Sequence, residues 1–429
     1  MCFKTFAILF LFSFAICKAQ DYDYSGKINN ELFTRVLDTK IKTLRVFKSG
    51  WEFSLPIINL NTDEKIEISF DDLDANYKDY DYTVVHLNAD RTQDQLIFAE
   101  YADGFQQNYV TDYSPSFNTQ IPYIHYKINI PNDNISLKIS GNYAVKIFKD
   151  HDPTMLVAIA FFVVVDQKVK ISALVKRPTL SKYAYNSQEV DFVVDHSDVP
   201  VNDAFSEIST YILQNNRWDN AVKNLKPRFV RINQLDYNYE EENIFNAGNE
   251  FRSFDSKYYK YKEIHTDSIW YDGTTYHFAL FPDVFRTYGT YVYAQDLNGM
   301  YSIRRELSYA PETEADYYFV HFQLSSPMQL RGKLYLNGQL TNQIINSDYE
   351  LKYNALLQRY TIDVLLKQGY YSYNYVYVPD DKSQQNKSMT EGAFYETEND
   401  YTIYIYHKPF GCRYQQLIGV ETANSVKKY

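Results

Sequence analysis

The chain has 429 residues, with 43 Lys and Arg against 54 Asp and Glu, which gives a formal net charge of −11. Hydrophobic residues make up 45% of the chain and charged residues 23%, proportions that exclude wholesale disorder and a polytopic membrane protein. The acidic balance also makes nucleic acid and anionic lipid surfaces poor partners. Aromatic residues reach 17%, including 43 Tyr, and this content favours an all-β fold because Tyr suits half-buried sheet surfaces.

The N-terminus predicts an export signal. Lys4 provides a weak positive start, and an apolar run over residues 6–16 leads to small residues before Gln20. We therefore expect a signal peptide over residues 1–19, removed from an exported protein. A lipoprotein signal at Cys17 is the alternative, and the bulky Ile before that cysteine disfavours it.

Cysteine usage fits an exported protein without disulfides. Of the three cysteines, Cys2 and Cys17 lie in the expected signal, so Cys412 alone remains in the mature chain. The mature protein must therefore be stabilised by its hydrophobic cores, which suits domains of more than about 100 residues.

Strand patterns recur throughout the chain, and sustained helical periodicity is scarce. Alternation of apolar and polar residues with period two is clear in residues 65–70. Turn signals such as Asn298-Gly299 and Asn337-Gly338 separate many of these segments. The expected strands are 65–70, 82–87, 124–130, 143–148, the apolar run 155–165, 190–194, 291–294, 319–324, 360–366 and 401–406.

Two charged segments mark the expected domain boundaries. One follows the apolar run that ends at Val165, and the other is the Pro-bearing segment 309–316. The sequence thus predicts three consecutive β-sandwich domains of ordinary size after the signal peptide. Sandwiches joined by short linkers predict an elongated rod, an architecture more typical of binding than of catalysis. The expected division is 1–19 signal peptide, 20–165 N-terminal domain, 166–310 middle domain and 311–429 C-terminal domain.

No common catalytic signature is present, because the G-x-S-x-G, G-x-G-x-x-G, Walker and H-E-x-x-H patterns are all missing. The acidic run 71–76 imitates a calcium loop, but Tyr77 replaces the turn Gly and Thr83 occupies the bidentate position. We expect that run to be a solvated corner between a strand and a loop. No catalytic, metal-ligating or cofactor-binding residue is assigned, and we expect a non-enzymatic protein without cofactors.

Two further patterns have a chemical and a structural interpretation. His86 and Asp90, with His125 elsewhere in the same block, could form a metal or acid–base pair. In a strand such residues lie about 13 Å apart, so we expect a hydrogen-bonded histidine in or near the core. Residues 371, 373, 375 and 377 are all Tyr and share one strand face. They could stack on sugars, but we favour packing against a neighbouring sheet.

Short motifs occur in a fixed order along almost the whole expected mature chain. They are SFDDL (69–73), HLNAD (86–90), SFNT (116–119), SGNY (140–143), QNNRWDN (214–220), AGNEFR (247–252), DLNG (296–299), LKQGYY (366–371) and TENDY (397–401). In this order the chain resembles the plug protein family of the type IX secretion system. Two departures are Arg91, where the family pattern has Trp, and the lack of an aromatic residue after Thr341-Asn342.

The resemblance implies a soluble periplasmic subunit that closes the periplasmic opening of a giant outer-membrane β-barrel translocon while the pore is idle. It implies association with that translocon, without direct membrane insertion. It also implies that the last domain is an immunoglobulin-like, glycogen-binding-type sandwich, with YLNG (335–338) as its hairpin. The competing function is a periplasmic or surface carbohydrate-binding protein, supported by the many Tyr residues and the resemblance of the last domain.

Polar and aromatic residues within two of these motifs are candidates for the partner interface, because such side chains are enriched at protein interfaces. The alternative is that they hold long loops or a seam between domains. The candidates are Arg217, Trp218, Asn249, Glu250 and Arg252.

Overall fold

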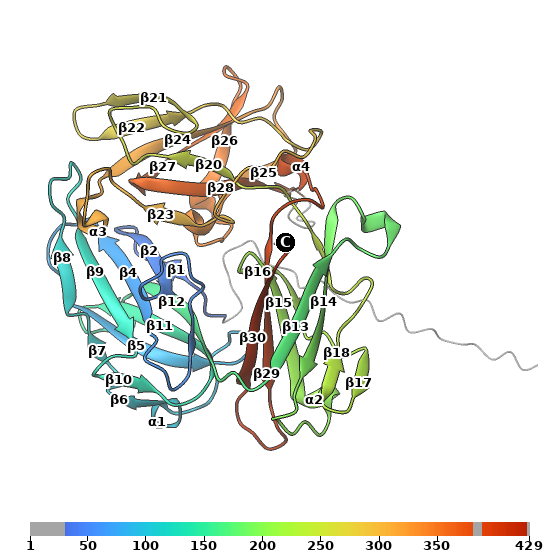
Figure 1. The fold of residues 1–429 in the computed structure, drawn as a ribbon. Coiled ribbons are helices and arrows are strands. Elements are labelled where there is room, and N and C mark those ends of the chain that lie inside the picture. Colours follow the sequence, from blue (N-terminus) through green and yellow to red (C-terminus); the bar gives the residue numbers. More distant parts are fainter. Residues whose placement is uncertain (1–30, 381–387, 427–429) are drawn as a thin grey trace, which may run out of the picture.

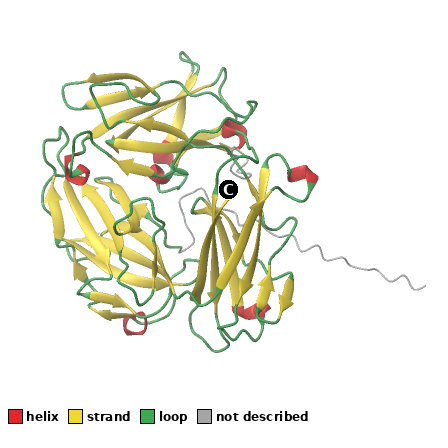
Figure 2. Ribbon diagram, viewed as in Figure 1, coloured by secondary structure: helices red, strands yellow, loops and turns green. Residues whose placement is uncertain are grey.

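The computed structural model describes residues 31–380 and 388–426, and almost all of their regular structure is β-strand (Figure 2). The all-β prediction is confirmed. The expected signal peptide over 1–19 lies outside the described residues. Helical structure is confined to single turns: α1 (Phe98–Tyr101), α2 (Ala204–Glu207), α3 (Pro311–Glu314), α4 (Ser388–Glu391) and the 3₁₀ turns Ser181–Tyr183, Gln339–Thr341 and Ser347–Tyr349.

The N-terminal unit, built from β1 to β12, contains two sheets packed face to face around a core that includes Ile68, Tyr126 and Phe162. The apolar run is β12, a buried strand near the middle of its sheet, as predicted. The first sheet has the order β1 (Arg35–Val36), β12 (Leu156–Val165), β11 (Gly141–Lys149), β5 (Tyr80–Leu87) and β7 (Asn108–Tyr109), with β3 (Ile57–Asn59) parallel to β12. The second sheet has the order β2 (Ile41–Lys48), β4 (Ile66–Asp72), β9 (Ile124–Ile130) and β8 (Asp112–Pro115), and a separate pair joins β6 (Ala102–Gly104) to β10 (Ile135–Leu137).

The middle unit also contains two sheets, and its core includes Phe192, Tyr237 and Ile403. Its first sheet comes from one continuous stretch of sequence, whereas its second joins strands from distant parts of the chain. The first sheet has the order β13 (Lys170–Lys176), β14 (Ser187–Asp195), β18 (Gln234–Asp236) and β17 (Phe229–Arg231), with β19 (Ile244–Asn246) paired to β14. The second has the order β16 (Arg217–Lys223), β15 (Ile208–Gln214), β29 (Asp400–His407) and β30 (Gln416–Asn424).

The C-terminal unit, built from β20 to β28, is one nine-stranded sheet that curls around its own core. Phe254, Phe322 and Tyr373 lie in that core. The strand order is β20 (Arg252–Asp255), β28 (Gly369–Pro379), β25 (Gly332–Asn337), β26 (Glu350–Asn354), β27 (Arg359–Lys367), β24 (Tyr317–Ser325), β22 (Tyr276–Leu280) and β21 (Thr266–Tyr271), with β23 (Tyr301–Ile303) paired to β28.

Strand pairing crosses the boundary expected between residues 310 and 311 in both directions. Strands β20 to β23 precede it but join the sheet of the C-terminal unit, while β29 and β30 follow it but complete the middle unit. The charged segment that suggested the boundary is a loop around α3. A loop signal marks where a strand ends, but it carries no information about which sheet the flanking strands join.

The three units lie around a common centre, and each contacts both of the others (Figure 1). Hydrogen bonds between Lys367 and Asp71, between Tyr406 and Asn142, and between Asn298 and Asp400 join the three pairs of units. The elongated rod expected from the sequence is therefore wrong. Among the described residues, no helix has the length and apolar character needed to span a bilayer.

Most expected strands are present, but residues 291–294 form none. Tyr291 instead donates a hydrogen bond of 2.5 Å to the Glu250 carboxylate, while Val292 and Tyr293 are exposed. The alternating pattern there follows a loop that has no neighbouring strand edge to pair with.

Candidate functional site

The seam between the N-terminal and C-terminal units contains a buried ionic cluster. Asp71 and His125 oppose each other on β4 and β9, and Tyr317 and Lys367 oppose each other on β24 and β27. These two cross-strand pairs meet at the Asp71 carboxylate. Lys367 Nζ lies 2.6 Å from Oδ2, the Tyr317 hydroxyl donates to the same oxygen at 2.6 Å, and His125 Nδ1 lies 2.7 Å from Oδ1.

The electrostatics of this cluster favour an ionised carboxylate. Asp71 is fully buried, and burial alone would raise its pKa. The charge of Lys367 and the hydrogen bond from His125 outweigh burial, so the pKa of Asp71 lies below its usual value. Lys367 also donates to the Glu312 carbonyl of α3 at 2.5 Å and lies 4.1 Å from the ring centroid of Tyr123. The cluster therefore ties both units to the short helix between them.

The acidic corner over residues 71–76 was expected to be solvated, and that expectation is wrong for its first two residues, whereas Asn76 is exposed. Asp71 and Asp72 are both buried at the end of β4, and the Tyr80 hydroxyl donates to Asp72 at 2.9 Å. Among the described residues, no group of three or more His, Cys, Asp or Glu side chains is placed to hold a metal ion.

A second part of the same seam uses main-chain donors. Asp316 accepts hydrogen bonds from the amides of Gln120 at 2.6 Å and Ile121 at 3.1 Å, and the Tyr123 hydroxyl donates to the Ala315 carbonyl at 2.7 Å. Burial raises the pKa of the Asp316 carboxyl despite these donors. The loop after β8 is thus hydrogen-bonded directly to the residues that lead into β24 of the C-terminal unit.

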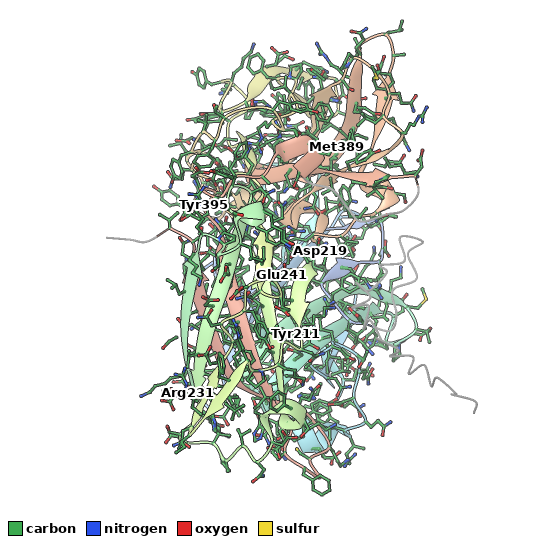
Figure 3. The ribbon with its side chains drawn as sticks, turned by 90° about the vertical axis from the view of Figure 1, so that its right-hand side faces the viewer. Tyr211, Asp219, Arg231, Glu241, Met389 and Tyr395 are labelled. Carbon is green, nitrogen blue, oxygen red and sulfur yellow. The ribbon has the colours of Figure 1, made fainter. Side chains whose placement is uncertain are left out.

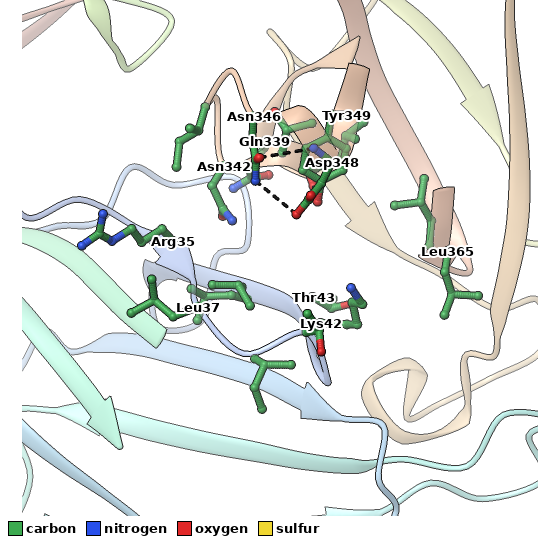
Figure 4. A pocket seen from close by; sticks show the side chains of 18 of the residues that line it. Arg35, Leu37, Lys42, Thr43, Gln339, Asn342, Asn346, Asp348, Tyr349 and Leu365 are labelled. Atoms are coloured by element: carbon green, nitrogen blue, oxygen red, sulfur yellow. Dashed lines mark hydrogen bonds between the residues drawn. The ribbon is translucent and has the colours of Figure 1, made fainter. Parts of the chain in front are cut away.

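A cavity of about 170 Å³ lies beside this seam, between β1, β2 and the segment 339–349 (Figure 4). Its lining mixes amide, hydroxyl and aromatic side chains with two cations, Arg35 and Lys42. Burial lowers the pKa of both, and for Lys42 the nearby Asp348 opposes that effect. The chemistry of the lining does not select one class of ligand.

The seam between the N-terminal and middle units is mainly aromatic. The Arg91 guanidinium lies 4.4 Å from the ring centroid of Trp218, whose ring also meets Phe161 edge-on at 5.6 Å. Tyr406 donates to Asn142 Oδ1 at 2.7 Å in the same seam. Phe161 and Tyr406 belong to a core cluster with members in both units, and Trp218 packs against that cluster, so the contact has the character of a protein interior.

The structure places the interface candidates of β16 in or near this seam. Trp218 is packed as described above. Arg217 donates two hydrogen bonds to the Asp219 carboxylate, from Nε at 3.1 Å and from Nη2 at 2.5 Å. Asp219 is labelled in Figure 3. Both candidates therefore make contacts within the chain, as the alternative interpretation expected.

The other three candidates lie in an ionic network inside and beside the C-terminal unit. Arg252 lies 2.7 Å from Asp283 and 3.0 Å from Glu391, and its side chain is 8% exposed. Asn249 donates to the Glu391 carbonyl at 2.8 Å. Burial raises the pKa of the Glu250 carboxyl, which accepts the hydrogen bond from Tyr291. This network holds α4 against β20 and β28, and it brings Asn249, Glu250 and Arg252 together.

Three of the four tyrosines of the ladder are internal, as predicted, whereas Tyr377 is half-buried and donates to the Arg331 carbonyl. Tyr371, Tyr373 and Tyr375 are buried, and Tyr371 stacks on Phe254 with centroids 5.2 Å apart. The hydroxyls of Tyr373 and Tyr375 both donate to Asp283 Oδ2, at 2.9 and 2.8 Å. These rings form part of the core, so they offer no platform to a sugar.

The expectation of a core histidine at position 86 is confirmed. His86 is buried, its Nδ1 is hydrogen-bonded to Asp94, and its ring meets Tyr143 edge-on at 4.9 Å. Asp90, which was considered as a partner of His86 and disfavoured, accepts hydrogen bonds from Thr92.

Lys367, Tyr317 and Asp316, which join the N-terminal and C-terminal units, were not predicted from the sequence. Lys367 lies within one of the ordered motifs, between apolar residues of its own strand and the tyrosine ladder of the next. A Lys in such apolar surroundings indicates a buried ion pair, and this pattern could have identified it.

These features define an all-β protein of interlocked β-sandwich units, held together by polar and aromatic seams. A family model described as "Type 9 secretion system plug protein 1st domain" matches residues 41–166, which covers most of the N-terminal unit. A crystal structure of a hypothetical protein from Parabacteroides merdae is similar over almost the whole chain. The two sequences are 39% identical, with a TM-score of 0.89, and the match covers 92% of this chain and 99% of that one.

The chain belongs to the type IX secretion system plug protein family. Proteins of that family are components of a secretion system, and the family is not a known family of enzymes. No curated protein matches the chain.

Proposed function

We propose that this chain is the non-enzymatic periplasmic subunit that plugs the periplasmic opening of the type IX secretion outer-membrane translocon when the pore is idle. The observation that carries the proposal is the match of residues 41–166 to the first domain of the plug family. The partner is then the giant outer-membrane β-barrel of the translocon.

The construction of the molecule supports this role. A stopper must keep its shape while it docks and releases, and relative motion is the default for domains joined only by linkers. Here each unit is hydrogen-bonded to the other two, and the Asp71–Lys367 pair is buried in one of the seams. The net charge of −11 keeps such a body soluble when it is not docked.

The competing carbohydrate-binding function was based on the many Tyr residues and on the resemblance of the last domain. Of the ladder tyrosines that could have stacked on sugars, Tyr371 and Tyr373 are buried against Phe254, Tyr301 and Phe322. No observation on the described residues favours it over the plug.

Two experiments test the proposal. Tagged protein is captured from solubilised native membranes, with a soluble-fraction capture as the control, and partners are identified by mass spectrometry. Recovery of a giant outer-membrane barrel is the expected result, and its absence despite detectable translocon in the input would refute stable docking.

The second experiment separates plugging from mere binding. Cells that lack the protein are expected to become permeable to a large antibiotic that intact outer membranes exclude, and expression of the wild-type chain restores the barrier. Unchanged permeability in the deletion strain would remove the plugging role even if the barrel is recovered.

A further inference from the structure

A row of aromatic and titratable side chains crosses the outer face of the C-terminal unit, away from the seams. It spans β21, β22, β24 and β27, which lie at the top of Figure 1. Trp270 directly opposes His277 across β21 and β22, and His321 opposes Asp363 across β24 and β27. The parallel register of β22 and β24 pairs His277 with Phe319 and Ala279 with His321, so the two histidines are offset by two positions and lie on the same face.

The two histidines are joined to each other, and each is held by a carboxylate. His277 Nδ1 lies 2.9 Å from His321 Nε2. On the far sides, His277 Nε2 lies 3.0 Å from Asp272 in the turn after β21, and His321 Nδ1 lies 2.6 Å from Asp363. Every ring nitrogen of the pair therefore has a hydrogen-bond partner.

The number of ring protons follows from this arrangement. An ionised carboxylate only accepts, so the nitrogens that face Asp272 and Asp363 must each carry a proton. The contact between the rings needs a third proton, whereas two neutral imidazoles hold only two. The complete chain of hydrogen bonds therefore carries one extra proton, shared between the two rings as a single imidazolium charge.

The surroundings suit that shared charge. The indole of Trp270 is nearly parallel to both imidazoles, with centroids 4.9 Å from His277 and 5.0 Å from His321, as in a cation–π contact. The hydrogen bond from His321 holds the pKa of the Asp363 carboxyl below its usual value. Other charged side chains on this face already have partners: Arg359 donates to Gln323, and Lys352 pairs with Glu350.

A metal ion fits the same pair less well. The two rings lie within 12° of coplanar and their centroids are 5.1 Å apart, so the facing nitrogens lie close to the line between the centroids. A zinc ion on that line would need the nitrogens about 4 Å apart, because zinc–nitrogen bonds are about 2.0–2.1 Å long. The separation of 2.9 Å is instead that of an N–H···N hydrogen bond.

We propose that His277 and His321 form a pH-responsive pair that controls the position of Trp270 on this face. The pair closes when it holds one shared proton. When the pH falls, a second proton binds between the two rings. Both facing nitrogens then carry N–H groups, which repel each other, and the rings separate. When the pH rises and the shared proton leaves, two lone pairs face each other and the rings separate again. Trp270, which covers both rings, moves with them.

The test uses the full chain labelled with 5-fluorotryptophan and followed by fluorine NMR. The sequence has 3 Trp, at positions 51, 218 and 270, so the Trp270 resonance is assigned by Trp270→Phe. We expect this resonance to shift in two separate steps, one on each side of the range in which the pair is closed. In His277→Gln and in His321→Gln we expect the two steps to collapse to one, because a single ring has no partner with which to share a proton.

His151→Gln is the matched control, because that histidine also pairs with a carboxylate, Asp81, at 2.7 Å but lies away from Trp270. The two-step titration should survive in it. Nitrogen-15 spectra of histidine-labelled protein give an independent readout, since they follow both rings directly. The proposal is overturned if the Trp270 resonance of the wild-type chain shifts in a single step identical to that of His277→Gln. It is also overturned if that resonance does not change with pH. Circular dichroism confirms that each variant is folded before its titration is interpreted.

Discussion

Lys367 places its ammonium 2.6 Å from the carboxylate of Asp71, although the two residues stand 296 positions apart and belong to different units. Lys367 is 1% exposed and Asp71 is not exposed at all. Removal of one member of such a pair is strongly destabilising, because the remaining charge stays buried without its main counter-ion. The attachment of the C-terminal unit to the N-terminal unit thus depends on both members being present.

The first prediction concerns the loss of that ammonium. Lys367→Met should lower the free energy of unfolding by about 3–5 kcal/mol, because it leaves Asp71 buried without its counter-ion. Denaturant unfolding followed by two spectroscopic probes measures the change and detects separate unfolding of the units. Lys333→Met is the control, since Lys333 pairs with Glu350 at 2.9 Å with its side chain 56% exposed. Such exposed pairs contribute about 0–1 kcal/mol. Equal losses in the two variants would contradict the assignment of the seam.

The second prediction concerns the pH dependence of the same pair. The pKa of Asp71 is depressed in the folded protein, so its contribution to stability is complete above the unfolded value of about 3.9 and is lost as the pH falls through the lower folded value. In Lys367→Met the counter-ion is gone, and burial raises the pKa of Asp71 instead. The stability difference between wild type and variant should therefore shrink as the pH is lowered from 7 toward 4. A difference that stays constant over this range would show that Asp71 does not carry the effect.

The third prediction concerns the aromatic seam between the N-terminal and middle units. A double-mutant cycle of Arg91→Met and Trp218→Leu should give a coupling energy of about 0.5–2 kcal/mol, because the guanidinium lies 4.4 Å from the indole centroid. Arg177→Met with Tyr185→Leu is the comparison, since that pair is 4.7 Å apart on an exposed surface. Its coupling should be the smaller of the two. Additive effects at Arg91 and Trp218 would mean that the contact contributes packing alone.

The fourth prediction separates two of the interface candidates. Arg252→Met should cost about 3–5 kcal/mol of stability, since Asp283 and Glu391 would lose their shared buried partner. Arg217→Met should be milder, because Arg217 pairs only locally with Asp219 among the contacts described above. Thermal unfolding measures both. Reduced recovery of the translocon is therefore informative about docking for Arg217→Met, and for Arg252→Met only after a normal melting temperature has been shown.

Sequence patterns correctly predicted the features of this fold that depend on the residues of a single strand. The apolar run at β12 and the packed tyrosines of β28 follow from hydrophobicity and alternation, which act on each strand wherever it lies. Asp71 shows the limit of such reasoning. Its neighbours in sequence indicated a solvated acidic corner, but its environment is set by Lys367 and Tyr317, which no local pattern connects to it.

The candidate site was predicted only in part, because the motifs identify residues but not the groups that those residues contact. The motifs singled out Trp218 and Arg252, and both residues do bind neighbouring groups tightly. The motifs do not show whether those groups belong to another protein or to this chain. That depends on how the units pack, and the packing is determined by strand pairing between distant parts of the chain. Strands β29 and β30 crossed the expected boundary because hydrogen-bonded edges can come from any point in the sequence.

The same strand exchange sets an order in which the molecule can be completed as the chain emerges from N- to C-terminus. All strands of the N-terminal unit lie before residue 166, so its core can close early. The middle unit must wait, because β29 and β30 supply half of its second sheet and bring Ile403 and Ile405 into its core. Until β29 and β30 have appeared, only β15 and β16 of the second sheet are present to cover the apolar face of β13 and β14. The middle unit is therefore the last of the three whose core can close as the chain emerges.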